Sequence, residues 1–281
     1  MASGSPPRPT NPTDGTGPAD LVRYSIDPDA PVPIYHQIKG NIRALIEDGH
    51  LRPGQALPPE RVLAAAYGAN RLTLRQAVGE LVHEGVLRRQ RGVGTFVAEP
   101  KLSLDMVGAA GFSDLIAAAG RGRSTRLISL EIVPARVRVA RHLELEENDR
   151  VWRLQRLRFA DGEPFLIETV YLPYARFPSL DEADFDHVSL FETLRRQAGC
   201  VPAESEDVLE PVILDEYERE LLDTGESTLG LLVEASTRDA DGVVFEYSTS
   251  IVRGDRSRYV FHTRRMTDDV SVPAGTGLLT R

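Results

Sequence analysis

The sequence predicts an α+β protein with two unlike parts: a small three-helix unit with a β-hairpin, then a larger antiparallel sheet with helices packed on it. Three observations predict this fold class. Apolar residues recur at helical spacing three times between residues 33 and 85. Beyond residue 120, strand patterns dominate and two Asp-Gly pairs mark hairpin turns. The charge also differs, with nine basic against six acidic residues over 33–100 and 22 against 32 over 101–281.

The composition limits the class of protein. The chain has 281 residues, of which 41% are hydrophobic and 27% charged, and a net charge of -9, as in ordinary globular proteins. Its one cysteine, Cys200, excludes an internal disulfide and a thiolate zinc cage, and predicts a cytoplasmic setting. No apolar run approaches the ~20 residues that a bilayer requires, so no membrane association is expected. No motif predicts a metal or a cofactor, and we expect neither.

The first two helices have clear start and stop signals. Apolar residues from Ile34 to Ile46 form one stripe, which Gly49 ends. A Pro-Pro pair then fixes the entry to a short helix over residues 60–67. The side of this second helix that we expect to be buried consists of Val62, Leu63, Ala65 and Ala66.

The third helix has two arginines on one side. Asn70 is placed to cap this helix, which extends to about residue 83. Its expected inner side consists of Leu74, Ala77, Val78 and Leu81. Arg71 and Arg75 lie one turn apart on another side, so their guanidinium groups project together. Short strands over 86–89 and 95–98, joined by a glycine-rich turn, complete a winged helix-turn-helix.

Such a unit suits a DNA duplex. The major groove admits one α-helix, and an arginine near the helix N terminus can donate two hydrogen bonds to guanine. The hairpin offers Arg88, Arg89 and Arg91 beside glycines that let the backbone approach a phosphate or a minor groove. We therefore expect double-stranded DNA as a partner.

Three motifs follow one another in this unit. They are Leu57-Pro58-Pro59-Glu60-Arg61, Asn70-Arg71-Leu72-Thr73-Leu74-Arg75-Gln76-Ala77 and Gly92-Val93-Gly94-Thr95-Phe96-Val97. Over residues 33–98 the chain resembles the DNA-binding domain of GntR-family bacterial transcription regulators. The resemblance implies that the DNA contacts come from Arg61, Asn70, Arg71, Leu72, Thr73, Arg75, Arg91 and Gly92. Arg71 and Arg75 would read bases, and Leu72 would meet a thymine methyl group.

The second part begins after a connector, over residues 100–111, that has few strong elements. The strands that we expect are 125–133, 151–159, 164–172, 230–239, 243–253 and 258–265. The helices that we expect are 112–119, 137–143, 188–197 and 215–222. Because Asp161-Gly162 and Asp241-Gly242 each join two strands through a tight turn, the sheet should be antiparallel.

Several polar residues of this part could form an interior site. Strand alternation puts Arg156 and Arg158 on one side, as a fork that can hold an anionic group. Glu246 could accept hydrogen bonds from hydroxyl groups of a ligand. Ser189 begins a helix, where its hydroxyl and the free N–H groups can hold a phosphate. Taken singly, each of these residues also fits a surface ion pair or a helix cap.

Five segments of the second part form a further pattern. They are residues 156–164, Tyr171-Leu172-Pro173 with Glu168, Ser189-Leu190-Phe191, Val244-Phe245-Glu246-Tyr247-Ser248 and Arg253-Gly254-Asp255-Arg256. The region is similar to the UTRA effector-binding domain of the HutC subgroup of GntR regulators, whose fold resembles chorismate lyase. The resemblance implies a small anionic metabolite as effector, with a phosphosugar as one candidate. Its ligands would be Arg156, Arg158, Ser189, Phe191 and Glu246.

These observations predict a transcription regulator, and a repressor in particular, rather than an enzyme. We expect a homodimer on a palindromic operator, with the effector adjusting its affinity. Two alternatives stay open: an enzyme with a chorismate-lyase fold, and an architectural DNA-binding protein with an inert dimerising domain. A ligand that changes operator affinity and remains chemically unaltered would favour the regulator over both.

The expected division of the chain follows from the same patterns. The five segments are a flexible leader over 1–30, a winged helix-turn-helix over 31–99, a linker and connecting helix over 100–119, an effector-binding and dimerisation domain over 120–268, and a tail over 269–281. The leader is rich in proline, serine and glycine, and it lacks the apolar stretch of a signal peptide.

Overall fold

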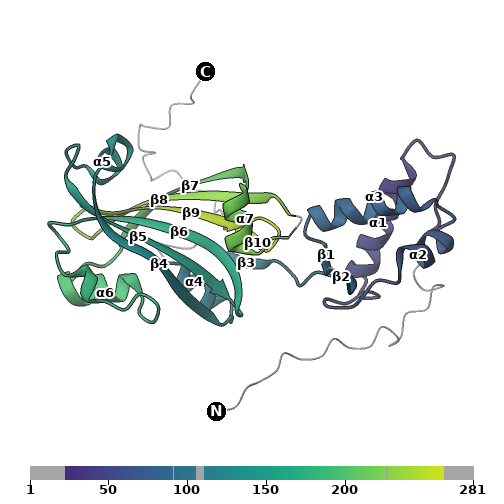
Figure 1. Cartoon of the computed structure of the whole chain (residues 1–281), viewed down its shortest axis with the longest axis horizontal. Helices are drawn as coiled ribbons and strands as arrows, with labels where there is room; N and C mark the ends of the chain where they lie inside the picture. The colour runs from purple at the N-terminus through teal and green to yellow at the C-terminus, as the bar shows by residue number, and fades with distance from the viewer. Residues whose placement is uncertain (1–22, 91, 106–110, 226, 263–281) are drawn as a thin grey trace, which may run out of the picture.

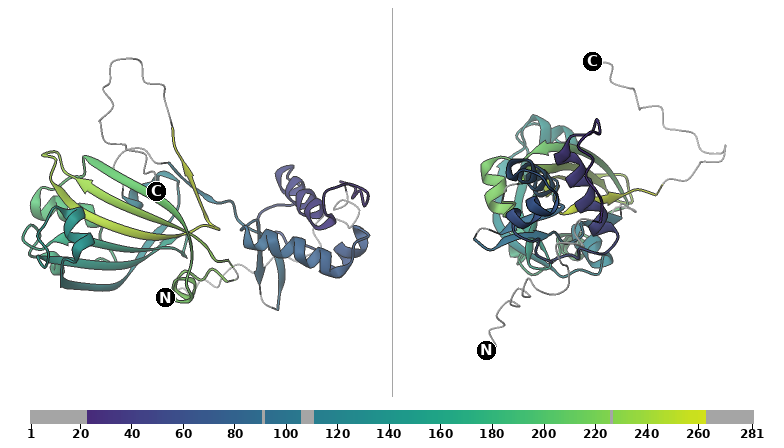
Figure 2. Two further views of the ribbon diagram at one scale, coloured as in Figure 1. Left: turned by 90° about the horizontal axis from the view of Figure 1, so that it is seen from above. Right: turned by 90° about the vertical axis from the view of Figure 1, so that its right-hand side faces the viewer.

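The computed structural model describes residues 23–90, 92–105, 111–225 and 227–262. Most of the expected leader, the expected tail and Arg91 lie outside the described residues. Figure 1 shows the N-terminal helices beside one end of a large sheet, and Figure 2 shows the same arrangement from two further sides. The predicted fold class, an N-terminal winged helix-turn-helix followed by an antiparallel-sheet α+β unit, is confirmed.

The N-terminal unit has three helices and a hairpin in the predicted order. Its elements are α1 (Ile34–Glu47), α2 (Glu60–Ala66), α3 (Arg71–His83), β1 (Leu87–Gln90) and β2 (Gly94–Val97). The stripe of α1 packs on α3 because both helices turn their apolar sides inward, and the four predicted inner residues of α3 are buried. This core is separate from those of the sheet.

The predicted inner side of α2 was partly wrong. Leu63 and Ala64 are buried, whereas Ala65 is exposed. Leu63 lies one turn before Tyr67, which is also buried, so these two fix the inward direction of the helix. Ala65, two residues after Leu63, is turned about 200° away from it around the helix and therefore faces out.

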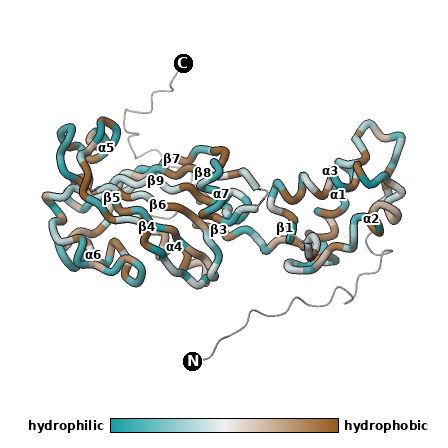
Figure 3. The backbone as a smooth tube through the Cα atoms, viewed as in Figure 1, coloured by the Kyte–Doolittle hydropathy of each residue, from teal (hydrophilic) through white to brown (hydrophobic). Residues whose placement is uncertain are grey.

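The C-terminal unit is built on a six-stranded antiparallel sheet with the order β4-β5-β6-β9-β8-β7. Its strands are β4 (Arg123–Pro134), β5 (Arg150–Ala160), β6 (Glu163–Pro173), β7 (Glu204–Ile213), β8 (Leu229–Arg238) and β9 (Val244–Arg253). Its helices are α4 (Phe112–Ala118), α5 (Val137–Leu143), η2 (Leu180–Glu182), α6 (Leu190–Ala198) and α7 (Glu216–Leu222). Figure 3 shows hydrophobic segments along the strands and in α1 and α3, where the cores lie.

Three strands differ from the predictions. β3 (Leu102–Asp105) forms within the expected connector and pairs in parallel with β10 (Ser257–Val260), outside the main sheet. β10 ends earlier than predicted, and residues 263–265 of the predicted strand lie outside the described residues. β7 was not predicted, because this edge strand has many acidic residues and is mostly exposed, so apolar alternation is weak.

The two faces of the sheet carry different helices. On one face Leu222 of α7 packs with Leu157 and Ile167. The sequence neighbours of Leu157 and Ile167 point to the opposite face; they are Arg156, Arg158 and Glu168. The N-terminal ends of α4 and α6 lie over that face and close a pocket there. In the described part of the chain, no helix is long and apolar enough to cross a membrane.

Candidate DNA-reading head and effector pocket

The start of α3 is fixed by a side-chain cap. The Asn70 side-chain oxygen accepts a hydrogen bond from the Thr73 backbone N–H at 2.8 Å. This bond fixes the start of α3 at Asn70 and with it the direction of the first helical turn. The capping role predicted for Asn70 is confirmed, and its oxygen is therefore already engaged with the helix.

The outer side of α3 presents the predicted reading residues to solvent. Arg71 is exposed, and the Arg75 side chain is 65% exposed. Leu72 between them is 76% exposed, although it is a large apolar residue. Arg75 Nε lies 3.4 Å from Glu60 Oε2 of α2, a contact that orients the guanidinium and leaves it open to solvent. Arg61 on α2 is also exposed, whereas Thr73 is half-buried.

The hairpin is tied to the helices by the same glutamate. Arg89 of β1 lies 3.7 Å from the other carboxylate oxygen of Glu60. The Arg88 guanidinium stacks over the Phe96 ring at 5.0 Å from its centre. At the tip, Gly92 has a φ of +76°, a conformation that favours glycine and allows a tight, exposed turn. The preceding Arg91 lies outside the described residues.

Two further basic residues of this unit are paired elsewhere. Lys39 of α1 contacts Glu80 at 2.9 Å and Glu84 at 2.7 Å, and Arg43 pairs with Glu84 at 2.5 Å. These pairs join α1 to the C-terminal half of α3, away from Arg71 and Arg75. The cations that join α1 to α3 are thus distinct from Arg71 and Arg75 of the reading surface.

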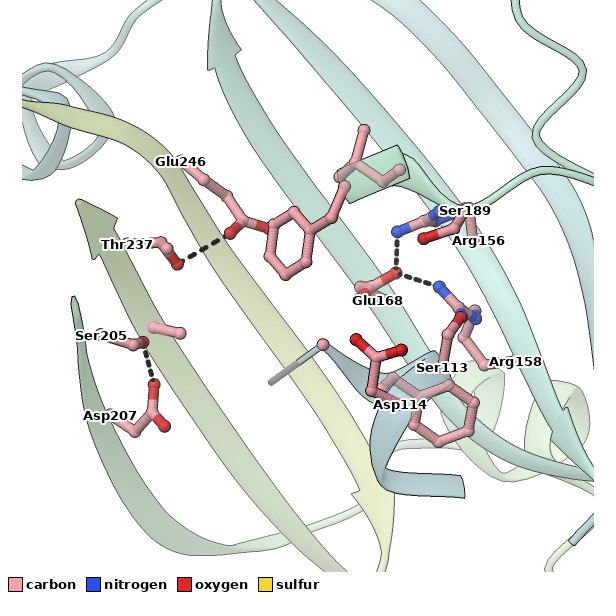
Figure 4. Close-up of a pocket in the computed structure, with 15 residues that line it drawn as sticks. Ser113, Asp114, Arg156, Arg158, Glu168, Ser189, Ser205, Asp207, Thr237 and Glu246 are labelled. Carbon is pink, nitrogen blue, oxygen red and sulfur yellow. Dashed lines mark hydrogen bonds and ion pairs between the residues drawn. The ribbon is translucent and has the colours of Figure 1, made fainter. Parts of the chain in front are cut away.

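The pocket of the C-terminal unit has an arginine pair at one end (Figure 4). Arg156 Nη2 lies 2.5 Å from Glu168 Oε2, and Arg158 Nη1 lies 3.1 Å from the same oxygen. Arg158 also donates to Ser113 Oγ of α4 at 2.7 Å. The two arginine side chains are 3% and 6% exposed, so both cations are desolvated. The predicted fork therefore exists, with Glu168 bound between its arms.

The ion cluster at this end of the pocket carries a net positive charge that an anion could compensate. Burial by itself would raise the pKa of Glu168, but the adjacent Arg156 and Arg158 outweigh it and hold that pKa below its ordinary value. Burial lowers the pKa of Arg158. Two guanidiniums against one carboxylate leave one positive charge in excess. The Nε atoms of both arginines are buried and have no hydrogen-bond partner among the described residues.

Ser189 lies beside Arg156 at the start of α6 (Figure 4), and Phe191 of the same helix also lines the pocket. Ser189 is the N-cap residue, yet its hydroxyl makes no cap hydrogen bond, so it remains available to a ligand. The first N–H groups of α6 lie beside it and lack intrahelical acceptors. Phe191 packs edge-on against Phe245 with ring centres 6.3 Å apart and walls the pocket.

Glu246 lies at the other side of the pocket (Figure 4). Its side chain is buried and accepts a hydrogen bond from Thr237 Oγ1 at 2.8 Å. Burial raises the pKa of Glu246 to about 7. All five residues predicted to hold an effector thus line one cavity, although their contact with a ligand stays a prediction.

Several residues that line the pocket were not predicted from the sequence. These are Ser113, Asp114, Glu168, Ser205, Asp207 and Thr237. Glu168 lies directly opposite Arg156 in the register of β5 and β6, but only because a bulge shifts that register, so the turn at Asp161-Gly162 would not have identified it. Ser205 and Asp207 come from β7, the strand that was not predicted. For Ser113 and Asp114 the sequence offers no signal, because α4 reaches the pocket only through tertiary packing.

Comparison with known proteins matches each of the two units to a family. The family "Bacterial regulatory proteins, gntR family" matches residues 34–97, and the UTRA domain family matches residues 118–258. The chain is 30% identical over 243 residues to the HTH-type transcriptional repressor NagR of Bacillus subtilis, a match that covers 86% of this chain and 100% of the relative. It is 32% identical over 209 residues to the histidine utilization repressor of Pseudomonas putida, with 74% and 84% covered.

Another relative and a solved structure agree. The mannosyl-D-glycerate transport/metabolism system repressor MngR of Escherichia coli is 29% identical over 233 residues, covering 83% of this chain and 97% of its own. The crystal structure of PhnF from Mycobacterium smegmatis matches with a TM-score of 0.57 and 28% identity, over 81% of this chain and 99% of that chain. These relatives are regulators, so the prediction of a regulator rather than an enzyme is confirmed. The chain belongs to the GntR family of bacterial transcription regulators, in the HutC-like subgroup that joins a GntR helix-turn-helix to a UTRA domain.

Proposed function

We propose that this chain is a repressor that binds a specific operator and that a small anionic metabolite, held in the C-terminal pocket, changes its operator affinity. One observation carries the effector part of this proposal: two buried guanidiniums in the lining of the pocket share a single carboxylate. Two buried cations with one carboxylate between them leave an uncompensated positive charge, and an anion in the pocket would compensate it. The families matched by the two units support the DNA-binding part.

At the DNA, α3 enters the major groove. Arg71 and Arg75 read guanine edges, since both are exposed on one side of the N-terminal half of the helix. The exposed Leu72 packs on a thymine methyl group, and Asn70 sets the helix start close to the duplex. The remaining contacts, to phosphates and the adjacent groove, come from Arg61, Thr73, Arg91 and Gly92.

The active form is a cytoplasmic homodimer on a palindrome. A two-fold pair presents two α3 helices to half-sites about one helical turn apart. For the effector to act at the operator, the two states of the dimer must differ in effector affinity, typically by about 1 to 3 kcal/mol. The five segments expected from the sequence, with dimerisation and effector binding over residues 120–268, are part of this proposal.

The effector is a small polar metabolite with an anionic group. Arg156 and Arg158 hold that group together with Ser189, while Phe191 packs on the ligand body and Glu246 meets its polar far end. A phosphosugar is one candidate with suitable chemistry. The names of two relatives mention mannosyl-D-glycerate and histidine, which are likewise small polar metabolites.

Operator binding tests the reading head. The wild-type protein selects its operator from random duplexes, and affinities are then measured at fixed salt. Arg75→Ala should lose about 1 to 3 kcal/mol at that operator and relax its specificity, because a bidentate base contact is removed. Arg52→Ala, which removes an exposed cation that does not lie on α3, should lose far less. An equal loss on all sequences would assign Arg75 to a phosphate instead.

Induction tests the pocket. Arg156→Ala should leave operator binding intact and abolish the response to a panel of phosphorylated and acidic metabolites. Ser189→Ala, which breaks no ion pair, should weaken the same response while the fold is retained. A normal response in both variants would place the effector elsewhere.

A further inference from the structure

The pocket has opposite charge at its two ends. Figure 4 shows Arg156 and Arg158 on one side of the cavity, and Glu246 and Asp207 on the other. The first pair comes from β5, the second from β9 and β7. Glu246 lies two strands from β5 in the sheet order, which corresponds to roughly 10 Å before the reach of the side chains is counted.

The acidic end has no cation of its own. Thr237 Oγ1 donates to Glu246 at 2.8 Å, and Ser205 Oγ donates to Asp207 at 2.6 Å. In the described part of the chain neither carboxylate forms an ion pair, although each can accept more hydrogen bonds than one hydroxyl supplies. Asp114 also lines the cavity without a side-chain hydrogen bond or ion pair to another described residue.

A purely anionic ligand would satisfy only half of this cavity. The lining holds two guanidiniums and four carboxylates, namely Asp114, Glu168, Asp207 and Glu246. Glu168 is bound by the arginines, so the other three face the cavity without a counter-charge. An anion that extended toward Glu246 would meet like charge there, whereas a cationic group would meet two acceptors, Glu246 and Asp207.

We propose that the effector is a zwitterion, with a phosphate or carboxylate at Arg156 and Arg158 and an ammonium group held by Glu246 and Asp207. This inference rests on the proposed function of the pocket and narrows its ligand class. The high pKa of Glu246 agrees with it, since a buried carboxylate that lacks its cation keeps its proton to higher pH. Thr237 and Ser205 position the two carboxylates toward the ammonium.

A matched pair of ligands tests the ammonium directly. The full chain is titrated at pH 8 with 6-aminohexyl phosphate and with 6-hydroxyhexyl phosphate, which share the anion and the spacer. The amine should bind at least about tenfold more tightly, because a partly buried ammonium–carboxylate pair is added. Glu246→Gln and Asp207→Asn should each reduce this advantage, the ratio of the two dissociation constants, to about threefold or less. Glu147→Gln, an exposed acid outside the pocket, should retain the advantage.

The outcomes separate the two proposals. Equal binding of both phosphates would keep the anion site and overturn the zwitterion. An amine advantage that survives in both acid variants would also overturn it, since the ammonium would then lie elsewhere. If the wild type binds neither phosphate, the anion site of the proposed function fails, and the inference fails with it.

Discussion

Glu246→Gln should stabilise the C-terminal unit, and the gain should grow with pH. Glu246 is 5% exposed and accepts one hydrogen bond from Thr237. Burial raises its pKa to about 7, the Thr237 bond and Arg156 lower it, and the carboxylates of Glu168 and Asp207 raise it further. The neutral acid is therefore the form that suits this site. Glutamine keeps an oxygen acceptor for Thr237 and carries no charge at any pH.

The magnitude follows from proton linkage. The folded chain holds the Glu246 proton up to about pH 7, whereas the unfolded chain releases it near 4.5. Between these values the folded state binds more protons, so the free energy of unfolding falls as pH rises. Complete ionisation in the folded state costs roughly 3 kcal/mol. Most of this cost appears between pH 5 and pH 8.5, and glutamine avoids it.

The single tryptophan provides the assay. Trp152 lies in the core beside the pocket, so its fluorescence during urea unfolding reports the C-terminal unit. From pH 5 to pH 8.5, the stability of Glu246→Gln relative to wild type should rise by about 2 to 3 kcal/mol. Glu147→Gln, on the exposed surface, should show no such rise. A difference that stays constant across this range, or a variant that is weaker at pH 8.5, would refute the reasoning.

Two other substitutions probe the ion cluster and the junction between the units. Glu168→Gln should lower the free energy of unfolding in urea by about 3 to 5 kcal/mol, because it leaves two buried guanidiniums without a counter-charge. Millimolar phosphate should restore part of that stability. A variant as stable as wild type would contradict this prediction. Gly85 has a φ of +72°, and an added Cβ would lie 2.7 Å from the Asp255 carbonyl oxygen. Gly85→Ala should therefore lower the thermal midpoint by more than Gly49→Ala, where φ is +75° and space is open. Gly79→Ala, inside α3 where an added Cβ meets open space, should raise the thermal midpoint. Equal effects of the substitutions at Gly85 and Gly49 would exclude a strained contact with Asp255.

Local patterns predicted most of the fold. The three N-terminal helices begin within one residue of their predicted starts, since proline and asparagine fix a helix start through local backbone conformation and capping. The central strands followed from alternation and Asp-Gly turns. β3 and β10 could not be predicted as a parallel pair, because they come from opposite ends of the C-terminal unit in the sequence and no local pattern relates them.

The pocket was predictable only in part, and one irregularity of the sheet explains why. A tight turn at Asp161-Gly162 pairs Ala160 with Glu163, and that register would continue to place Ile167 opposite Arg156. Instead, a bulge between Arg158 and Phe159 shifts the register by one residue, so Glu168 lies opposite Arg156.

This shift decides which face of the sheet carries the charge. Because opposed residues share a face, an unshifted β6 would turn Ile167 toward the arginines and Glu168 toward the helix α7. Two guanidiniums would then be buried without a carboxylate, and Glu168 would be buried among the apolar residues around α7, both at a large cost. The extra residue in β6, Phe165, is buried with Leu104, Ile116 and Val252, and this packing fixes the bulge. The apolar core beside β3 and α4 therefore determines the electrostatics of the pocket, through a single residue that no charge pattern in the sequence would single out.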